Sequence, residues 1–222
     1  MPSTQSGVSL IMVLLFLVAI TGLTVWAARQ SMLGEGMARN QLDLEIARQA
    51  AESALRDAER DLKNATPGVT LTNAACSRGS VIIPAKFDAT CTTGLCYQND
   101  AYYAASEWQH NSSGNTVNPE PWWPTGKGGT WNDEFKSKPS RTIATTTGAD
   151  SDKCDFKGGV PLGTYTGAPV IRGVAIQPEY LIEYFKRSIP TRQESAVYRI
   201  TARGFGYAQR TQVVLQTTFV PE

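Results

Sequence analysis

The cysteines are the side chains with the clearest chemistry in this chain. They are Cys76, Cys91, Cys96 and Cys154. Zinc sites usually pair cysteines as CxxC or combine them with histidines, whereas this chain has no CxxC pair and a single histidine, His110. Disulfides are therefore expected in an oxidising compartment. Four cysteines allow three pairings, and the sequence leaves all three open. A turn at Gly94 would close Cys91 on Cys96 locally. That choice, which we favour, leaves Cys76 for Cys154.

Other reactive side chains form no recognisable catalytic pattern. The chain has no GxSxG, P-loop or HExxH motif, and a histidine-based triad would have only His110, which we interpret as a surface-loop residue. The aspartates of residues 150–155 are spaced faintly like a calcium loop, but Cys154 takes the fifth ligand position and Asp155 the usual glycine position. We interpret this segment as a solvated loop, with a calcium site as the alternative. The sequence thus predicts a non-enzymatic protein with no metal and no cofactor.

Tryptophans are concentrated in one part of the chain. Four of them lie within 24 residues: Trp108, Trp122, Trp123 and Trp131. Such rings can stack on sugars, anchor a protein contact or fill a core. We expect about two of the four in the core and single out Trp122 and Trp123 as the candidate partner surface.

Composition bounds the elements that must position these residues. With 222 residues, 41% hydrophobic and 18% charged, the chain is long enough for one ordinary domain plus an appendage. A net charge of +1 argues against a nucleic-acid partner held by electrostatic attraction. The charges are unevenly distributed, since residues 1–28 contain no Asp, Glu, Lys or Arg. One end of the chain therefore suits a different solvent from the rest.

Residues 8–28 form an apolar segment of the right length for a membrane span. As a helix, these residues rise about 31 Å, which matches the hydrocarbon core of a bilayer. A cleaved secretory signal would have a shorter apolar region and a basic start. A buried core helix is the alternative, but the segment is apolar on all faces. Arg29 and Arg39 follow the span and by themselves mildly favour a cytoplasmic C-terminal part.

The helical pattern continues beyond the span, through residues 29–63. Apolar residues recur there at spacings of three and four, as one stripe of a helix: Leu44, Ala47, Ala51, Ala54, Leu55, Ala58 and Leu62. No proline interrupts this amphipathic half, and the pair Pro67–Gly68 follows it. We expect the stripe to pack on the protein's own head, and the other faces to contact neighbouring copies or partners.

The remaining residues, 64–222, form the expected globular head. Residues 64–169 are rich in turn-forming residues and are interpreted as a loop-rich insertion that needs disulfide staples. Residues 170–220 contain four strand-like segments: 170–177, 180–187, 196–203 and 211–220. Their two-residue alternation predicts one buried face and one wetter face. The fold class is therefore α+β, with a long N-terminal helix packed on an antiparallel sheet of about four strands.

The N-terminus resembles that of the type IV pilin superfamily. The resemblance rests on Gly7, on the sequence VSLI from Val8 to Ile11, and on the unbroken apolar run that leads into an amphipathic helix. It implies that residues 1–7 are a leader peptide, which a prepilin peptidase removes after Gly7, and that the new terminus at Val8 is N-methylated. It also implies a single-pass protein of the bacterial inner membrane with a periplasmic head, and this topology overrides the weak charge bias.

Three segments resemble PilX-type minor pilins: residues 52–60, 197–206 and 212–218. One position departs from the general pilin pattern, because most pilins have glutamate at the fifth mature residue and this chain has Met12. In the family that carboxylate neutralises the amino terminus of a neighbouring subunit, so its absence suits a subunit at the pilus tip. The leader MPSTQSG is a second departure, because it has no basic residue.

The resemblance implies a structural role in a type IV pilus. We expect a minor pilin that joins a tip complex, primes pilus assembly and supports adhesion or twitching motility at the cell surface. The implied partners are other minor pilins, the major pilin, the inner-membrane assembly machinery, the prepilin peptidase and a large tip adhesin. There are two alternatives. One is the tip pseudopilin of a type II secretion system, which typically carries a much larger inserted domain. The other is a membrane-tethered periplasmic module that binds carbohydrate.

Overall fold

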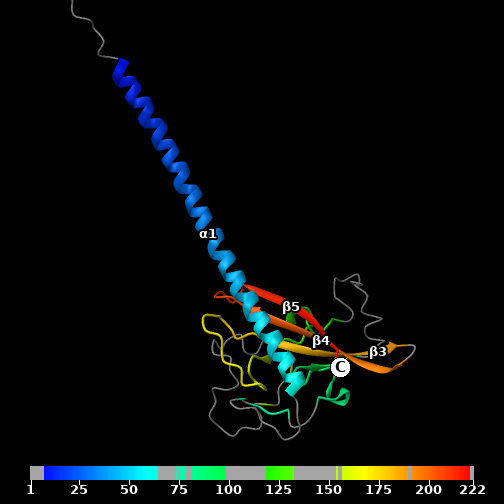
Figure 1. Cartoon of the computed structure of the whole chain (residues 1–222). Coiled ribbons are helices and arrows are strands. Elements are labelled where there is room, and N and C mark those ends of the chain that lie inside the picture. Colours follow the sequence, from blue (N-terminus) through cyan, green and yellow to red (C-terminus); the bar gives the residue numbers. More distant parts are fainter. Residues whose placement is uncertain are drawn as a thin grey trace, which may run out of the picture. The chain divides into compact units, whose positions relative to one another are not determined.

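The computed structural model describes residues 8–64, 74, 76–78, 82–98, 119–132, 154, 157–189 and 192–220 (Figure 1). Helix α1 spans Val8–Asn64, which is one residue beyond its predicted end. The chain divides into two compact units, Met1–Leu42 and Asp43–Glu222. The first unit thus contains the N-terminal part of α1, and the second contains the rest of α1 and the head.

The N-terminal part of α1, residues 9–42, exposes its side chains on every side. It contains a stretch that is long and apolar enough to cross a membrane, and none of that stretch is buried. Its threonines are satisfied within the helix, because the hydroxyls of Thr21 and Thr24 donate to the carbonyls three residues earlier at 2.9 Å. Such bonding suits an apolar solvent, in which an unpaired hydroxyl is costly. This part of α1 fits the predicted single-pass membrane anchor.

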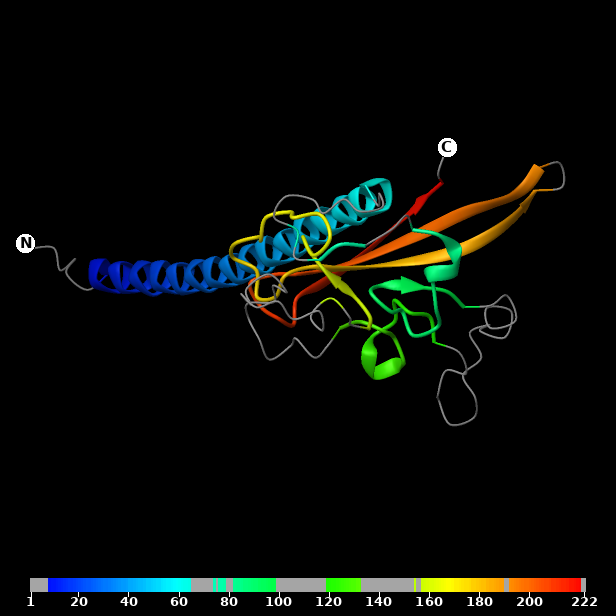
Figure 2. The ribbon, with the colours of Figure 1, turned by 90° about the horizontal axis from the view of Figure 1, so that it is seen from below.

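The second unit contains a mixed five-stranded sheet (Figures 1 and 2). Its strands are β1 (Leu95–Cys96), β2 (Val160–Pro161), β3 (Glu179–Ile189), β4 (Arg192–Phe205) and β5 (Gln212–Phe219). Two short 3-10 helices lie outside the sheet, η1 (Pro84–Lys86) and η2 (Thr125–Lys127). Strands β3, β4 and β5 form the predicted antiparallel meander. The short strands both pair with β3, β1 in parallel and β2 antiparallel. The fold class is α+β, as the sequence predicts.

Residues 170–177 are not a strand, which corrects one of the four strand predictions. The Gln177 side chain instead accepts a hydrogen bond from the Ile171 N–H at 2.9 Å and donates one to the Ile171 carbonyl at 2.7 Å. Between them Gly173 has a φ of +84°, a left-handed conformation that turns the chain. The side-chain amide thus bonds the N–H and the carbonyl of Ile171, which a neighbouring strand would otherwise pair with. The sheet consequently has three long strands plus two short ones from the loop-rich region.

One face of the sheet packs on the part of α1 that belongs to the second unit. Its buried side chains come from β3 and β4: Tyr180, Ile182, Tyr184, Tyr198, Ile200 and Ala202. The alanines of the predicted stripe are fully buried and allow very close approach, since a Cβ on Gly204 would overlap the Ala47 carbonyl oxygen. The prediction is wrong for Leu44, which is 53% exposed and is not part of the buried stripe. Its neighbour Asp43 contacts the head instead.

The opposite face of β3 and β4 is also buried, although the alternation predicts a wetter face. Leu181, Glu183 and Thr201 are all fully buried. Figure 2 shows segment 119–132 (green) on the other side of β3 and β4 from α1, and Trp131 and the Cys91 and Cys96 side chains cluster with Leu181. The loop-rich region therefore forms a third layer. Two-residue alternation is uninformative for strands that are covered on both faces.

Candidate functional site

The N-terminus holds two candidate sites, the processing bond and the position of the usual pilin glutamate. Gly7 lies outside the described residues, and Val8 is the first residue of α1. Met12 lies about one helical turn further along, 61% exposed among equally exposed apolar neighbours. Its thioether offers apolar contact and no charge. This part of α1 therefore presents an apolar surface that lipid or other helices can cover.

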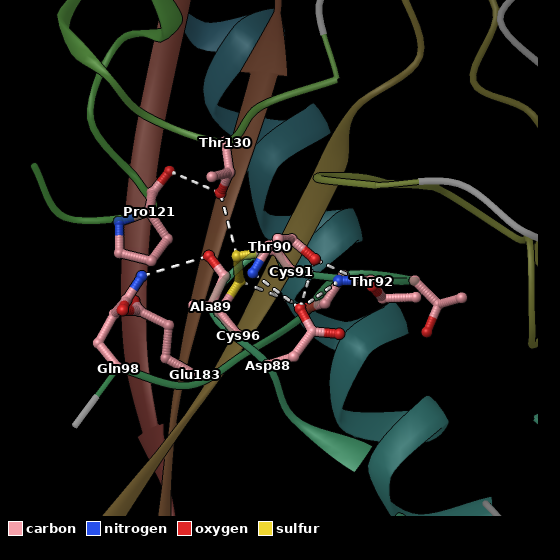
Figure 3. Close-up of a disulfide and its surroundings, with 12 residues drawn as sticks. Asp88, Ala89, Thr90, Cys91, Thr92, Cys96, Gln98, Pro121, Thr130 and Glu183 are labelled. Carbon is pink, nitrogen blue, oxygen red and sulfur yellow. Dashed lines mark hydrogen bonds between the residues drawn. A yellow bond between two sulfur atoms is a disulfide. The ribbon is translucent and has the colours of Figure 1, made fainter.

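The four cysteines form two disulfides. Cys76 is bonded to Cys154 with Cα atoms 5.7 Å apart, and Cys91 is bonded to Cys96 with Cα atoms 4.1 Å apart. Figure 3 shows the second bridge and the Thr130 hydroxyl, which donates to Cys91 Sγ at 3.1 Å. The first bridge joins residues 78 apart in sequence and the second joins residues 5 apart. Together they fasten the loop-rich region, and no thiol remains for a metal.

Asp88 organises the turn that the second bridge closes. Its Oδ1 accepts hydrogen bonds from the N–H and the hydroxyl of Thr90, both at 2.8 Å, and from the N–H of Thr92 at 3.2 Å (Figure 3). Burial alone would raise the pKa of the Asp88 carboxyl, but these hydrogen bonds outweigh burial and lower its pKa. Cys91 and Thr93 have φ values of 55° and 53°. The turn is thus held in a left-handed conformation that a free peptide disfavours.

Several sequence-based candidates lie outside the described residues: His110, Trp108 and the aspartates of residues 150–155. Cys154 is the one position of that aspartate segment that is described, and its sulfur is bonded to Cys76. Its sulfur is therefore not available to a metal ion. In the described part of the chain, no group of three or more His, Cys, Asp and Glu side chains is arranged to hold a metal ion.

Asp43 fastens one end of the sheet to α1, a role that the sequence did not suggest. It accepts hydrogen bonds from the N–H groups of Tyr207 at 2.5 Å and Ala208 at 3.3 Å, and from the Thr211 hydroxyl. The Thr211 bond is the largest cause of a lowered pKa at Asp43, and the two N–H groups and the Arg210 charge act in the same direction. The loop between β4 and β5 is thus bonded to the helix through one carboxylate.

Asp57 makes a similar connection from the middle of the helix face. It accepts from the Gly163 N–H at 2.7 Å and from the Thr166 hydroxyl. Burial raises the pKa of the Asp57 carboxyl, and these two hydrogen bonds offset burial only in part. An acid in an alanine-rich stripe is the sequence signal that would have found this residue, because a buried acid must have a partner.

Asp61 and Arg78 form a buried ion pair further along α1. Arg78 Nη2 lies 2.5 Å from Asp61 Oδ2, and the Tyr180 hydroxyl donates to the same oxygen at 2.8 Å. Arg78 also donates to the Thr93 carbonyl at 2.8 Å and stacks 3.6 Å from the centre of the Tyr165 ring. Desolvation would lower the pKa of Arg78, but Asp61 outweighs it and raises the pKa. Burial raises the pKa of Tyr180 as well. The cluster joins α1, the disulfide turn and β3.

Two cross-strand ion pairs lie on the second face of the sheet. In the β3–β4 register, Glu179 is opposite Arg203 and Glu183 is opposite Arg199. Arg203 Nε donates to Glu179 at 2.9 Å, and Arg199 pairs with Glu183 at 2.7 Å. Arg199 also reaches Glu120 at 2.5 Å, which ties segment 119–132 to β4. Two acids four apart on one strand, followed by two arginines four apart on the next, are the signal that would have found these pairs.

Three of the described tryptophans, Trp122, Trp123 and Trp131, lie in segment 119–132. Trp131 is buried, with 4% exposure, whereas Trp122 and Trp123 are partly exposed. The rings of Trp122 and Trp123 meet edge to face with centroids 6.3 Å apart. Trp122 Nε1 donates to Glu120 at 2.6 Å, and Trp131 Nε1 donates to the Trp122 carbonyl at 2.8 Å. Trp131 thus fills the cluster of Cys91, Cys96 and Leu181 on the second face of the sheet. The two candidate partner residues, Trp122 and Trp123, lie in the same segment.

Two family profiles match the chain and together cover most of it. The PilX N-terminal family matches residues 6–56, and the C-terminal family of the type IV pilus assembly protein PilX matches residues 92–221. No curated protein and no solved structure matches the chain significantly. The first match contains the exposed apolar part of α1. The second contains Cys96, the tryptophan segment and the sheet. Members of this family are structural pilus proteins that associate with other pilus components. The chain therefore belongs to the PilX family of type IV pilus assembly proteins, as a minor pilin.

Proposed function

We propose that this protein joins a complex of minor pilins at the pilus tip and primes assembly of the fibre. The observation that carries the proposal is Met12, an exposed apolar residue where most pilins have glutamate. In the fibre body that carboxylate has the amino terminus of a neighbour as its partner. A carboxylate in an apolar environment is stable only when it is paired. A subunit with no neighbour on one side is therefore better without it.

The processing and the membrane topology of the protein are inferred from the same resemblance to type IV pilins. The prepilin peptidase removes residues 1–7 by cleavage after Gly7, and Val8 becomes the N-methylated terminus. The apolar part of α1 anchors the protein in the bacterial inner membrane until it joins the fibre. The head lies in the periplasm, an oxidising compartment that is compatible with its two disulfides.

The head supplies the contacts of the tip complex. Its partners are other minor pilins, the major pilin, the inner-membrane assembly machinery and a large tip adhesin. Trp122 and Trp123 form the proposed partner surface, because aromatic side chains contribute most to such contacts when a partner covers them. The complex supports adhesion or twitching motility through shape and packing, without catalytic turnover.

Replacement of Gly7 tests the processing step. Gly7→Trp should leave the leader attached, retain the protein in the membrane and reduce the number of pili per cell. An immunoblot measures the mass of the product, and electron microscopy counts the pili. Gly22→Ala is the matched control, because a Cβ at Gly22 meets open space. Cleavage of the Gly7→Trp protein at the same bond, with normal piliation, would refute this proposal.

Location in the fibre tests the tip assignment separately. Sheared pili labelled with gold-conjugated antibody against the head should carry particles at one end. Met12→Glu should lower incorporation, because the added carboxylate would have no charged partner at the tip. Gold distributed along the fibre, or a Met12→Glu protein that incorporates as well as the wild type, would contradict the tip assignment even if processing occurs as proposed.

A further inference from the structure

A cleft of about 370 Å³ lies between segment 119–132 and strands β4 and β5. Its walls include the side chains of Trp122, Pro124, Thr125, Trp131, Arg203 and Gln212. The β4–β5 register puts Val214 opposite Arg203, and Val214 also lines the cleft. Alternate β5 residues, Gln212 and Val214 among them, are exposed, so the third layer leaves this face of β5 open. The volume is within the range of small-molecule sites.

The Trp122 ring is held in place by its polar neighbours. Its Nε1 donates to Glu120 at 2.6 Å, and its carbonyl accepts from Trp131 Nε1 at 2.8 Å. Glu120 is fixed in turn by Arg199 at 2.5 Å. Because the indole N–H is already bonded, the ring contributes chiefly its face to the cleft. A rigid aromatic surface loses little conformational entropy when a ligand covers it.

The cleft also contains polar groups suited to hydroxyls. The Thr125 Oγ1 is buried and has no hydrogen-bond partner among the residues that the structure describes. A buried hydroxyl without a partner is destabilising, and a ligand hydroxyl would relieve that cost. Across the cleft, Gln212 supplies an exposed amide that both donates and accepts. These groups suit a ligand with several hydroxyls, because each hydroxyl can both donate and accept a hydrogen bond.

The charges around the cleft disfavour an anionic ligand. Arg203 pairs with the fully buried carboxylate of Glu179, so that pair is neutral. The neighbouring cluster of Glu120, Glu183 and Arg199 contains two carboxylates and one guanidinium. A phosphate or carboxylate would therefore meet no excess of positive charge. The chemistry favours a neutral ligand with one apolar face and a rim of hydroxyls.

We propose that this cleft binds a neutral pyranose unit of a carbohydrate, stacked on the face of Trp122. The C–H groups on one face of a pyranose carry partial positive charge, which the negative face of an indole attracts. The sugar hydroxyls bond the exposed Gln212 amide and, once its side chain rotates toward the cleft, the Thr125 hydroxyl. This site goes beyond the assembly role and does not depend on it, but because Trp122 also belongs to the proposed partner surface, a sugar and a protein partner would compete for it.

Binding is tested with full-length protein in lauryldimethylamine oxide micelles, a detergent chosen because it contains no sugar. The probes are cellobiose, maltose and lactose at millimolar concentrations, with glucuronate as the anionic comparison. Saturation-transfer NMR detects bound sugar, and tryptophan fluorescence gives the dissociation constant. At least one neutral disaccharide should bind and glucuronate should not. Failure of all three neutral sugars, or binding of glucuronate alone, would overturn the proposal.

Two variants assign the binding to the cleft. Trp122→Leu should weaken binding about tenfold or more, the usual effect of losing an aromatic stacking surface. Thr125→Val, which keeps the shape and removes the hydroxyl, should weaken it roughly two- to tenfold. Tyr207→Ser is the control, because Tyr207 is a 61% exposed aromatic residue that does not line the cleft, and it should leave affinity unchanged.

Thermal unfolding of each variant separates loss of binding from loss of structure. If Trp122→Leu unfolds, Thr125→Val still decides the matter. Wild-type affinity in a folded Thr125→Val protein would contradict the proposed site. Co-purification tests whether the cleft is a protein interface instead. If the wild type binds no sugar and Trp122→Leu fails to co-purify with other minor pilins, the cleft is a protein interface and the carbohydrate proposal is wrong.

Discussion

Glu183 of β3 and Arg199 of β4 lie opposite each other in the sheet, and their side chains form an ion pair at 2.7 Å. Two guanidinium nitrogens donate to the two carboxylate oxygens, at 2.8 and 2.7 Å. The Glu183 side chain is fully buried, whereas Arg199 keeps 24% exposure and also bonds Glu120. The paired geometry explains how a carboxylate can be buried in this sheet. It also connects two strands to the layer that covers them.

Removing the arginine should be strongly destabilising. Arg199→Met would remove the guanidinium that pairs with the buried Glu183 carboxylate, and breaking a buried ion pair typically lowers the free energy of unfolding by about 3–5 kcal/mol. Urea denaturation of the full-length protein in micelles, followed by circular dichroism, measures this. Arg172→Met is the control, because Arg172 is exposed, and its effect should stay within about 0.5 kcal/mol.

The double variant Glu183→Leu with Arg199→Met should recover most of the lost stability. It removes both charges and fills the space with apolar atoms, which is often neutral for a buried pair. A double variant as unstable as Arg199→Met alone would show that lost packing, rather than the broken ion pair, causes the destabilisation.

The two disulfides should differ in their contribution to stability. Bridges stabilise chiefly by restricting the unfolded chain, and the effect grows with the length of the closed loop. Cys76→Ser with Cys154→Ser opens a separation of 78 residues, and Cys91→Ser with Cys96→Ser opens one of 5. The expected losses are about 4.5 and about 2 kcal/mol. Denaturation of the two double variants side by side provides the measurement, and equal losses would argue against this account.

The helix–sheet contact should be intolerant of any added side chain at Gly204. A Cβ there would overlap the Ala47 carbonyl oxygen and crowd Ala51, so Gly204→Ala should cost about 1–3 kcal/mol by overpacking. Gly126→Ala is the matched control, since a Cβ at Gly126 meets open space. A Gly204→Ala protein with wild-type thermal stability would mean that α1 can shift away from β4 without loss.

Much of the fold could be predicted from the sequence, because its periodic patterns are strong. The apolar run predicts the exposed part of α1, and the alanine stripe predicts the face that packs on the sheet. The alternation around Tyr180 and Ile200 predicts which residues of β3 and β4 share the face that packs on α1, since a period of two assigns alternate residues to opposite faces, but it does not predict that the other face is buried too. Turn-rich composition likewise marks the loop-rich region, although it does not show where that region packs.

The rest depends on contacts between distant residues, which local patterns do not encode. The third layer requires Glu120 to meet Arg199, 79 residues away, and the cleft at Trp122 exists only because that layer stops at β4. Residues 170–177 have strand-like composition, yet a side-chain bond from Gln177 to Ile171 prevents pairing. The partners of Asp43 are likewise distant in sequence, on the β4–β5 loop, and an isolated helix gives no sign of what covers that position.

Asp43 should make the attachment of the β4–β5 loop sensitive to acid. The Thr211 hydroxyl, the N–H groups of Tyr207 and Ala208, and the Arg210 charge lower its pKa below the usual 3.8. A folded pKa below the unfolded value means that the stabilisation is complete above pH 3.8 and is lost as pH falls through the folded pKa. Asp43→Asn should therefore have a lower melting temperature than the wild type near neutral pH. The difference should shrink below pH 3.8.

Asp57, on the same helix, has a raised pKa where Asp43 has a lowered one, so the two carboxylates should change stability with pH in opposite directions. Burial raises its pKa above 3.8, so the ionised form is penalised in the folded state. The wild type then loses stability as pH rises from 3.8 through the folded pKa. As pH rises over that range, the melting temperature of Asp57→Asn should rise relative to that of the wild type. The melting temperature of Asp43→Asn should instead fall relative to that of the wild type. Melting temperatures of the three proteins between pH 2.5 and 7 measure both trends. Parallel trends would mean that a general acid effect, rather than the surroundings of each carboxylate, controls the stability.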